Sequence, residues 1–286
     1  MSHREIDVLF QGIPNSVCCH QIDGLLVDPG PESSVRNLFE ALGDERPRGV
    51  LLTHIHLDHA GATGALIERW PDLPVWVHER GAKHVIDPSR LVASATRIYG
   101  EDQMAKLWGR IVPVPEENVR VLEGQGGLLE GPDGPIEGFR WAYTPGHAVH
   151  HAAYLHEPSG TAFTGDVAGV RIGDGPPIPP TPPPDIDVEL WHRSIDLLES
   201  WKPKALAVTH FGTFHDAEEH LRTLRVNLDE IAEMARGVDA QTFEARMRER
   251  MEATGNTESY FAAMPPDTLY AGLSRYFEKR DTAQTT

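Results

Sequence analysis

The sequence has few cysteines, few basic residues and no long apolar run, and each shortage excludes a class of protein. Its only cysteines, Cys18 and Cys19, are adjacent, which is poor geometry for a bridge and too few for a disulfide framework. No stretch approaches the roughly 18 apolar residues of a membrane span, and the first residues lack the apolar segment of a signal peptide. We therefore expect a cytoplasmic protein without a membrane partner.

Basic residues are outnumbered by acidic ones. The 26 Lys and Arg against 43 Asp and Glu give a formal net charge of −17 over 286 residues. Such a surface repels nucleic-acid phosphates, so we expect no nucleic-acid partner. A chain of this length buries about three quarters of its unfolded surface and needs no structural metal to form a core. Metal ligands in this chain would therefore serve a function.

Short apolar runs and helical patterns outline the organisation of the chain. Four runs are typical of buried strands: residues 49–53, 139–144, 161–164 and 205–209. Helices are predicted over residues 35–42, 60–69 and 93–107, and again after a cap at Asp185 or Asp187. The pattern predicts an α/β fold in which helices pack on a sheet.

Two segments leave alternatives open. The proline-rich segment 173–184 cannot form a helix or a central strand, and it is either a rigid lid or a plain connector. From residue 216 onward the patterns are helical, which predicts a catalytic domain over 1–215 and a C-terminal helical extension over 216–286. The apolar face of this extension either caps the active site or forms the interface of a homodimer.

Histidine is the abundant residue type, with 15 in the chain. His54, His56, Asp58 and His59 directly follow the first buried run. His54 and His56 would point one way, while Asp58 and His59 swing to the other side as the chain enters a helix. The other three runs end near His147, Asp166 and His210. Because ligand-bearing residues collect at strand ends, we expect all seven to form two neighbouring clusters of metal ligands.

This arrangement, His54-x-His56-x-Asp58-His59 followed by His147, Asp166 and His210, resembles the metallo-β-lactamase-fold metallohydrolase superfamily over roughly residues 5 to 215. The resemblance implies a four-layer αββα sandwich. It also implies one metal held by His54, His56 and His147, a second held by Asp58, His59 and His210, and Asp166 as a ligand that bridges both.

The resemblance implies a metal-dependent hydrolase that acts on a small-molecule substrate. Two divalent cations about 3.5–4 Å apart lower the pKa of a shared water and polarise a carbonyl or phosphoryl group. We expect two Zn²⁺, with Fe²⁺ or mixed divalent metals as the alternative, and cleavage of an ester, lactone, thioester or phosphoester. Asp58 is also expected to act as a catalytic residue that orients the hydroxide.

Several activities within the superfamily remain open, and the sequence does not name the substrate. A lactonase or phosphotriesterase-like member would have a largely apolar pocket. For a glyoxalase II-like thioesterase, no basic cluster that could bind a glutathione carboxylate is evident. The alternative reaction class is a mononuclear non-heme iron persulfide dioxygenase, which resembles this chain at His54, His147 and Asp166. A regulatory scaffold that keeps the metal site is the third alternative.

The remaining histidines and two aromatic residues are interpreted as structural. We expect structural or surface roles for His20, His78, His84, His150, His151, His156, His192 and His220. We favour a structural or surface role for His215 too, and a pocket role near His210 is its alternative. Tyr99 and Trp108 are expected to pack in the core rather than line a pocket.

Overall fold

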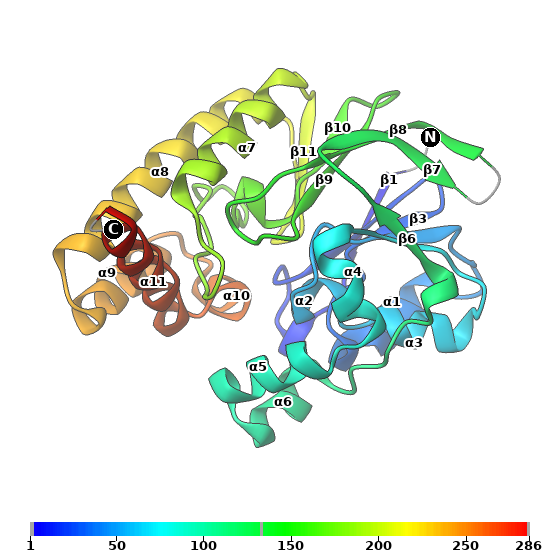
Figure 1. The fold of residues 1–286 in the computed structure, drawn as a ribbon, viewed down its shortest axis with the longest axis horizontal. Coiled ribbons are helices and arrows are strands. Elements are labelled where there is room, and N and C mark those ends of the chain that lie inside the picture. Colours follow the sequence, from blue (N-terminus) through cyan, green and yellow to red (C-terminus); the bar gives the residue numbers. More distant parts are fainter. Residues whose placement is uncertain (1–2, 132–133, 285–286) are drawn as a thin grey trace.

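The computed structural model describes residues 3–131 and 134–284, and these contain two six-stranded sheets with helices on their outer faces (Figure 1). The first sheet has the spatial order β1 (His3–Asp7), β2 (Cys18–Ile22), β3 (Leu25–Val27), β4 (Gly49–Leu51), β5 (Val75–His78) and β6 (Val119–Leu122). The second has the order β12 (Gly212–Phe214), β11 (Ala205–Val208), β10 (Thr161–Phe163), β9 (Ala152–His156), β8 (Gly134–Tyr143) and β7 (Gly126–Gly131).

The two sheets pack face to face through an apolar layer. Buried side chains from both sheets form one cluster, including Leu51 and Trp76 from the first and Phe163 from the second. Two hydrogen bonds also cross this layer: the Trp76 indole N–H donates to the Glu130 carbonyl oxygen over 2.7 Å, and the Tyr154 hydroxyl donates to that of Leu52 over 2.8 Å. The predicted four-layer αββα sandwich is confirmed.

Helices cover both outer faces. Those on the first sheet are α1 (Val35–Leu42), α2 (Leu57–Ala60), α3 (Thr63–Arg69), α4 (Glu79–Ile86), α5 (Ser89–Tyr99) and α6 (Glu101–Trp108). Those on the side of the second sheet are α7 (Val188–Ser200), α8 (Ala217–Gly237), α9 (Ala240–Glu252), α10 (Thr257–Ala263) and α11 (Pro266–Gln284). Within the described ranges, none of these helices has both the length and the apolar character that a bilayer span requires.

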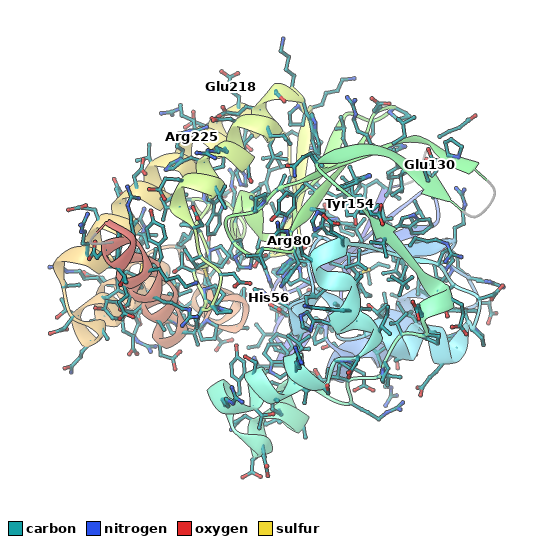
Figure 2. All side chains as sticks on the ribbon, viewed as in Figure 1. His56, Arg80, Glu130, Tyr154, Glu218 and Arg225 are labelled. Carbon is teal, nitrogen blue, oxygen red and sulfur yellow. The ribbon has the colours of Figure 1, made fainter. Side chains whose placement is uncertain are left out.

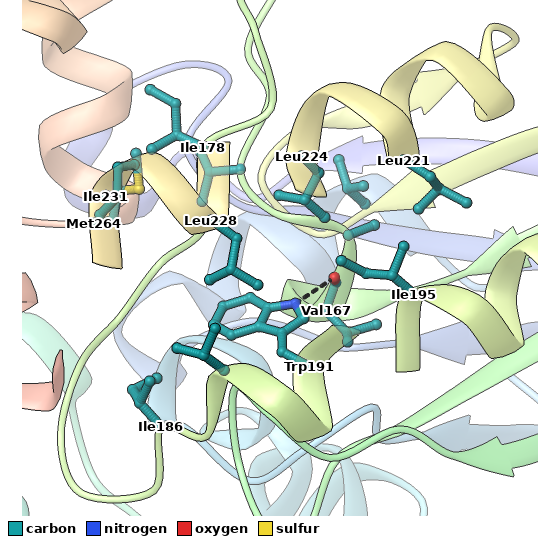
Figure 3. Close-up of a cluster of buried hydrophobic side chains, with 14 of the residues drawn as sticks. Val167, Ile178, Ile186, Trp191, Ile195, Leu221, Leu224, Leu228, Ile231 and Met264 are labelled. Atoms are coloured by element: carbon teal, nitrogen blue, oxygen red, sulfur yellow. Dashed lines mark hydrogen bonds between the residues drawn. The ribbon is translucent and has the colours of Figure 1, made fainter. Parts of the chain in front are cut away.

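The C-terminal helices share a core with the second sheet. Fully buried Trp191 of α7 donates its indole N–H to the Val167 carbonyl oxygen over 2.8 Å and lies among side chains of α8, such as Leu224 and Leu228 (Figure 3). Side chains of α9, α10 and α11 continue the same cluster. Helix α8 begins at Ala217, and the predicted domain boundary at residue 215 stays a prediction.

Two predicted helices are each divided in the structure. The helix predicted over 93–107 is α5 and α6, separated by Gly100 with a φ of 78°. Glycine adopts this left-handed conformation without steric cost, so it ends one helix and starts the next at a new angle. The helix predicted over 60–69 is α2 and α3. Of the two predicted caps for α7, Asp187 is the one that accepts a hydrogen bond, from the Leu190 N–H over 2.9 Å.

We predict that His220 makes the fold sensitive to acid. Its Nε2–H donates to the Ala168 carbonyl oxygen over 2.7 Å, and Arg171 donates to Nδ1 over 3.2 Å, which ties α8 to the turn that follows β10. Burial, assisted by the Arg171 charge, lowers the pKa of His220 from 6.5 to about 4. The neutral ring is favoured in the folded state, so its stabilising contribution is full above pH 6.5 and is lost as the pH falls toward 4.

The change His220→Gln keeps a donor and an acceptor but removes the titration. Between pH 7 and 4.5, the wild type should lose roughly 2 kcal/mol more unfolding free energy than this variant. Urea denaturation in the presence of chelator measures the difference, with His215→Gln at an exposed histidine as the control. Parallel pH profiles for wild type and His220→Gln would contradict the prediction.

Candidate metal centre

The seven residues predicted as ligands lie together at one end of the two sheets. His54 and His56 follow β4, while Asp58 and His59 lie in α2. His147 lies between β8 and β9, Asp166 follows β10 and His210 follows β11. The ligand atoms of His54, His56 and His147 lie within 4.8 Å of one another, as do those of Asp58, His59 and His210. The structure therefore brings together the same two sets that the resemblance implies.

In the first set, His54, His56 and His147 (the histidine set), the ring nitrogens lie close together. Nε2 of His54 and Nδ1 of His56 are 3.0 Å apart, and Nε2 of His147 lies 3.1 Å from the same Nδ1. The ligand atoms of the second set, Asp58, His59 and His210 (the Asp58 set), are similarly close to one another. Nε2 of His59 lies 3.3 Å from Nε2 of His210, and this Nε2 of His210 lies 3.4 Å from an Asp58 carboxylate oxygen. Each set thus offers three convergent donor atoms.

Asp166 lies between the two sets. Its Oδ1 is 3.3 Å from His59 Nε2, and its Oδ2 is 3.3 Å from His147 Nε2. Among the described residues, Oδ1 is buried and accepts no hydrogen bond in the arrangement shown. One carboxylate oxygen therefore faces each set, which is the placement that a bridging ligand requires.

Two glycines let the backbone turn where these side chains are needed. Gly146, with a φ of 135°, precedes His147, and a Cβ there would lie 2.3 Å from the Trp191 Cα atom. Gly165, with a φ of 47°, precedes Asp166, and a Cβ there would lie 2.4 Å from the Thr53 hydroxyl oxygen. A side chain at either position would push a candidate ligand away from the centre.

Hydrogen bonds from the outer ring nitrogens fix the tautomers of three histidines. Because a carbonyl or carboxylate oxygen only accepts, Nδ1 must carry the proton where it faces one. His147 donates from Nδ1 to Pro180 over 3.0 Å, and His210 donates to Ser16 over 2.6 Å. His59 donates to the Asp28 carboxylate over 2.8 Å. In the neutral rings, Nε2 of all three therefore carries a lone pair that points into the centre.

Converging lone pairs require positive charge between them. In their neutral forms, the His59 and His210 rings would place two unprotonated nitrogens 3.3 Å apart, beside the carboxylates of Asp58 and Asp166. Two nitrogens bound at about 2.0–2.1 Å to one tetrahedral zinc lie about 3.3–3.4 Å apart. The observed separations of 3.0 to 3.3 Å are close to this value. The donor set and its geometry thus fit divalent metal ions.

The two sets differ in electrostatics. Burial, assisted by neighbouring imidazoles, lowers the pKa of His54 well below its usual range, and burial lowers the pKa of His147 to about 4. At His59, the effect of burial is outweighed by Asp166, Asp58 and Asp28, which raise its pKa well above its usual range. The histidine set is therefore neutral near pH 7, whereas the Asp58 set attracts positive charge.

Asp28 contacts the candidate site but was not predicted from the sequence, because the pattern of Asp28-Pro29-Gly30 is typical of a turn. It is fully buried, and it accepts hydrogen bonds from the backbone N–H and hydroxyl of Thr53, from His59, and from the Thr209 hydroxyl. One sequence signal for such a buried acceptor is a threonine directly before a candidate ligand. Thr53 precedes His54, and Thr209 precedes His210. Asp28 orients His59 from the side opposite the centre.

A cavity of about 620 Å³ opens over the centre. The residues that line it differ in part from those expected from the sequence. His56, Asp58 and Asp166 lie in its wall. His215 does not, since it is exposed and outside the residues that line this cavity, which agrees with the favoured surface role and not with the alternative pocket role. His84 and His150, expected to be structural, do line it, as do Tyr99, Trp108 and prolines of the segment 173–184.

Two packed mixed sheets with helices outside and a His/Asp cluster at one end define a metal-binding αββα protein. Residues 20–210 match the sequence profile of the metallo-beta-lactamase superfamily, which covers more than half of the chain. The chain belongs to this superfamily.

Relatives extend this comparison. The chain is 27% identical over 215 residues to metallo-beta-lactamase fold-containing protein ST1585 from Sulfurisphaera tokodaii, covering 73% of this chain and 77% of that one. The solved structure of ST1585 has a TM-score of 0.62 and covers 77% and 85% of the two chains. Probable metallo-hydrolase YqgX of Bacillus subtilis is 29% identical over 50% of this chain and 60% of its own. The fold of protein TTHA1429 from Thermus thermophilus, 20% identical with a TM-score of 0.64, covers 98% of this chain and 94% of that one.

We predict that Asp28→Asn weakens metal binding at the Asp58 set. The amide would present N–H groups where the carboxylate now accepts hydrogen bonds, so His59 would lose its fixed tautomer. Loss of such an outer partner costs about 10- to 100-fold in metal affinity. Zinc affinity measured by chelator competition should fall by this factor for one of two ions.

Asp23→Asn is the matched control for this variant. Asp23 also has a positive φ, 47° against 51° for Asp28, and it also pairs with a histidine, His156, at 3.2 Å. His156 lies outside the candidate ligand sets, so this control should bind zinc as the wild type does. If Asp28→Asn binds zinc with unchanged affinity, the conclusion that Asp28 positions His59 for metal binding is wrong.

Proposed function

We propose that the protein is a dinuclear zinc hydrolase that cleaves an ester, lactone, thioester or phosphoester bond of a small molecule. The observation that carries the proposal is the convergence of lone-pair nitrogens and carboxylate oxygens into two sets that share Asp166. The relative YqgX, whose name describes it as a probable metallo-hydrolase, supports the same reaction class.

Each set of residues would hold one cation. His54, His56 and His147 would hold the first, while Asp58, His59 and His210 would hold the second, and Asp166 would contact both. When bound, two divalent cations supply Lewis-acid activation of water and of the scissile bond at neutral pH. This chemistry requires no side-chain nucleophile.

Asp58 has a second role in the proposal. Burial would raise the pKa of its carboxyl group, but His59 and His210 outweigh burial and lower the pKa to about 2, so the group is ionised near neutrality. Its side chain is 18% exposed and lies in the cavity wall. The ionised Asp58 carboxylate would accept a hydrogen bond from the attacking water and orient it toward the substrate.

The cavity wall supports a reaction of a partly apolar substrate. Tyr99 and Trp108 contribute aromatic surface from one side, and Met264 and Leu269 contribute apolar surface from the C-terminal helices on the other. Such walls exclude bulk water and strengthen electrostatic interactions at the reacting bond. The Pro180 carbonyl that orients His147 belongs to the same wall, so the proline-rich segment takes part in both the centre and the pocket.

We predict that Asp166→Asn abolishes turnover by removing the shared ligand. The zinc-loaded wild type should hydrolyse at least one of four probes: 4-nitrophenyl hexanoate, hexanoyl N-acetylcysteamine thioester, γ-decalactone and bis-4-nitrophenyl phosphate. Asp166→Asn should lower kcat/KM at least about 100-fold and bind fewer than two zinc ions per chain. Asp174→Asn, at an exposed position of the proline-rich segment, is the control.

Two results would overturn the proposal. One is a wild type that binds two zinc ions and hydrolyses none of the probes. The other is Asp166→Asn with undiminished turnover and two bound zinc ions. A mononuclear iron site built from His54, His147 and Asp166 would leave the converging Asp58, His59 and His210 without a function, and for this reason we favour the dinuclear hydrolase.

A further inference from the structure

The cavity above the metal centre has cationic as well as apolar walls. Arg80 and Lys83 of α4 and Arg90 of α5 line it. The sequence analysis found no basic cluster, because these residues are spread over eleven positions of an acidic chain. The fold brings them to one cavity.

None of the three cations forms a close ion pair with a carboxylate, and the nearby Asp87 interacts with Arg90 only through its charge. Within the described ranges, no ion pair includes Arg80, Lys83 or Arg90, and all three side chains are exposed to solvent. Arg80 lies over the Tyr143 ring, 5.6 Å from its centroid. By contrast, Arg46, Arg110 and Arg225 each pair with a carboxylate; the partners are Asp72, Glu68 and Asp196.

Carboxylates in the cavity do not cancel this charge. Asp58 and Asp166 belong to the metal centre, which leaves Glu79 and Asp185 as the other acidic residues in the wall. Three cations therefore face two carboxylates outside the centre. In a chain with a net charge of −17, three cations around one cavity depart from the acidic character of the rest of the surface.

The cationic helix lies directly beside the metal-site segment. A Cβ at Gly81 would be 2.9 Å from the Ile55 side chain and 3.3 Å from His150 Cβ, so α4 contacts the chain between His54 and His56. Arg80 and His56, both labelled near the centre of the view in Figure 2, line the same cavity. A substrate at the centre would therefore have a second group within reach of these cations.

Another part of the cavity wall is apolar. Trp108 stacks on Phe10 with ring centroids 5.4 Å apart, and Tyr99 packs edge-on against Trp108 at 5.4 Å. This wall suits the hydrocarbon part of a substrate.

We propose that Arg80, Lys83 and Arg90 form an anion-binding rim, and that the substrate is an ester or thioester with an apolar portion and a carboxylate or phosphate group away from the scissile bond. The proposal rests on the hydrolase function proposed above. Arginine binds both anions through paired N–H donors, so the rim alone does not distinguish them.

Two matched substrate pairs test the rim and identify the anion. In the first, 4-nitrophenyl hexanoate is compared with the mono-4-nitrophenyl ester of adipic acid, which adds a carboxylate to the acyl part. In the second, hexanoyl N-acetylcysteamine is compared with hexanoyl coenzyme A, which adds phosphates to the leaving part. The wild type should favour the anionic member of one pair by about 10-fold or more in kcat/KM at low salt.

The variant Arg80→Gln/Lys83→Gln/Arg90→Gln should bring this preference to about 2-fold or less, mainly by raising KM for the anionic member. The control is Arg97→Gln, which removes one positive charge from α5 at an exposed position outside the cavity lining and should keep the preference. Adding salt to 0.5 M should reduce the preference of the wild type, since rim charges are screened.

Binding separates failure of the rim from failure of the hydrolase function. Calorimetry compares adipate with hexanoate, and coenzyme A with N-acetylcysteamine, on the zinc-loaded proteins. If no probe is hydrolysed but the wild type binds an anionic member about 10-fold more tightly and the triple variant does not, the hydrolase function fails and the rim stands. Equal rates and equal affinities within both pairs, or a preference that survives in the triple variant, would overturn the rim.

Discussion

The arrangement of the centre depends on the hydrogen bonds that the buried carboxylate of Asp28 accepts. It accepts four hydrogen bonds, from two donors of Thr53 after β4, from His59 in α2 and from Thr209 after β11. A buried carboxylate is costly unless its oxygens are fully satisfied. Satisfying this one fixes segments of both sheets against each other at the end where the ligands lie.

Hydrogen bonds on the outer side of the histidine rings also determine the chemistry that the centre can support. Outer hydrogen bonds from His59, His147 and His210 turn their unprotonated nitrogens inward. Several lone pairs then meet carboxylates in a buried volume, and only positive charge makes this arrangement favourable. Protons partly provide that charge at His59, whereas two divalent cations would provide it for both sets at once. The cavity places a solvent-accessible face of this charged region beside apolar walls.

The sequence predicted which side chains converge because these residues follow a local rule. Each of the four buried runs is followed within three residues by histidine or aspartate, and strand ends meet at one end of a sheet sandwich. Other features depend on contacts between distant segments. Asp28 reads as a turn until Thr53 and Thr209 are seen beside it, and Gly100 divides one predicted helix through its positive φ rather than through any loss of apolar pattern.

The pocket was the part least predictable from the sequence, because segments distant in the chain form its wall. Arg80 lies in α4 and Met264 directly follows α10, far apart in the chain, yet they line one cavity. The central claim is that two cations occupy this centre, and anomalous diffraction at the zinc edge from zinc-loaded crystals tests it most directly. We predict two peaks, one among His54, His56 and His147 and one among Asp58, His59 and His210, with Asp166 between them. A single peak, or zinc bound only outside these residues, would contradict the account.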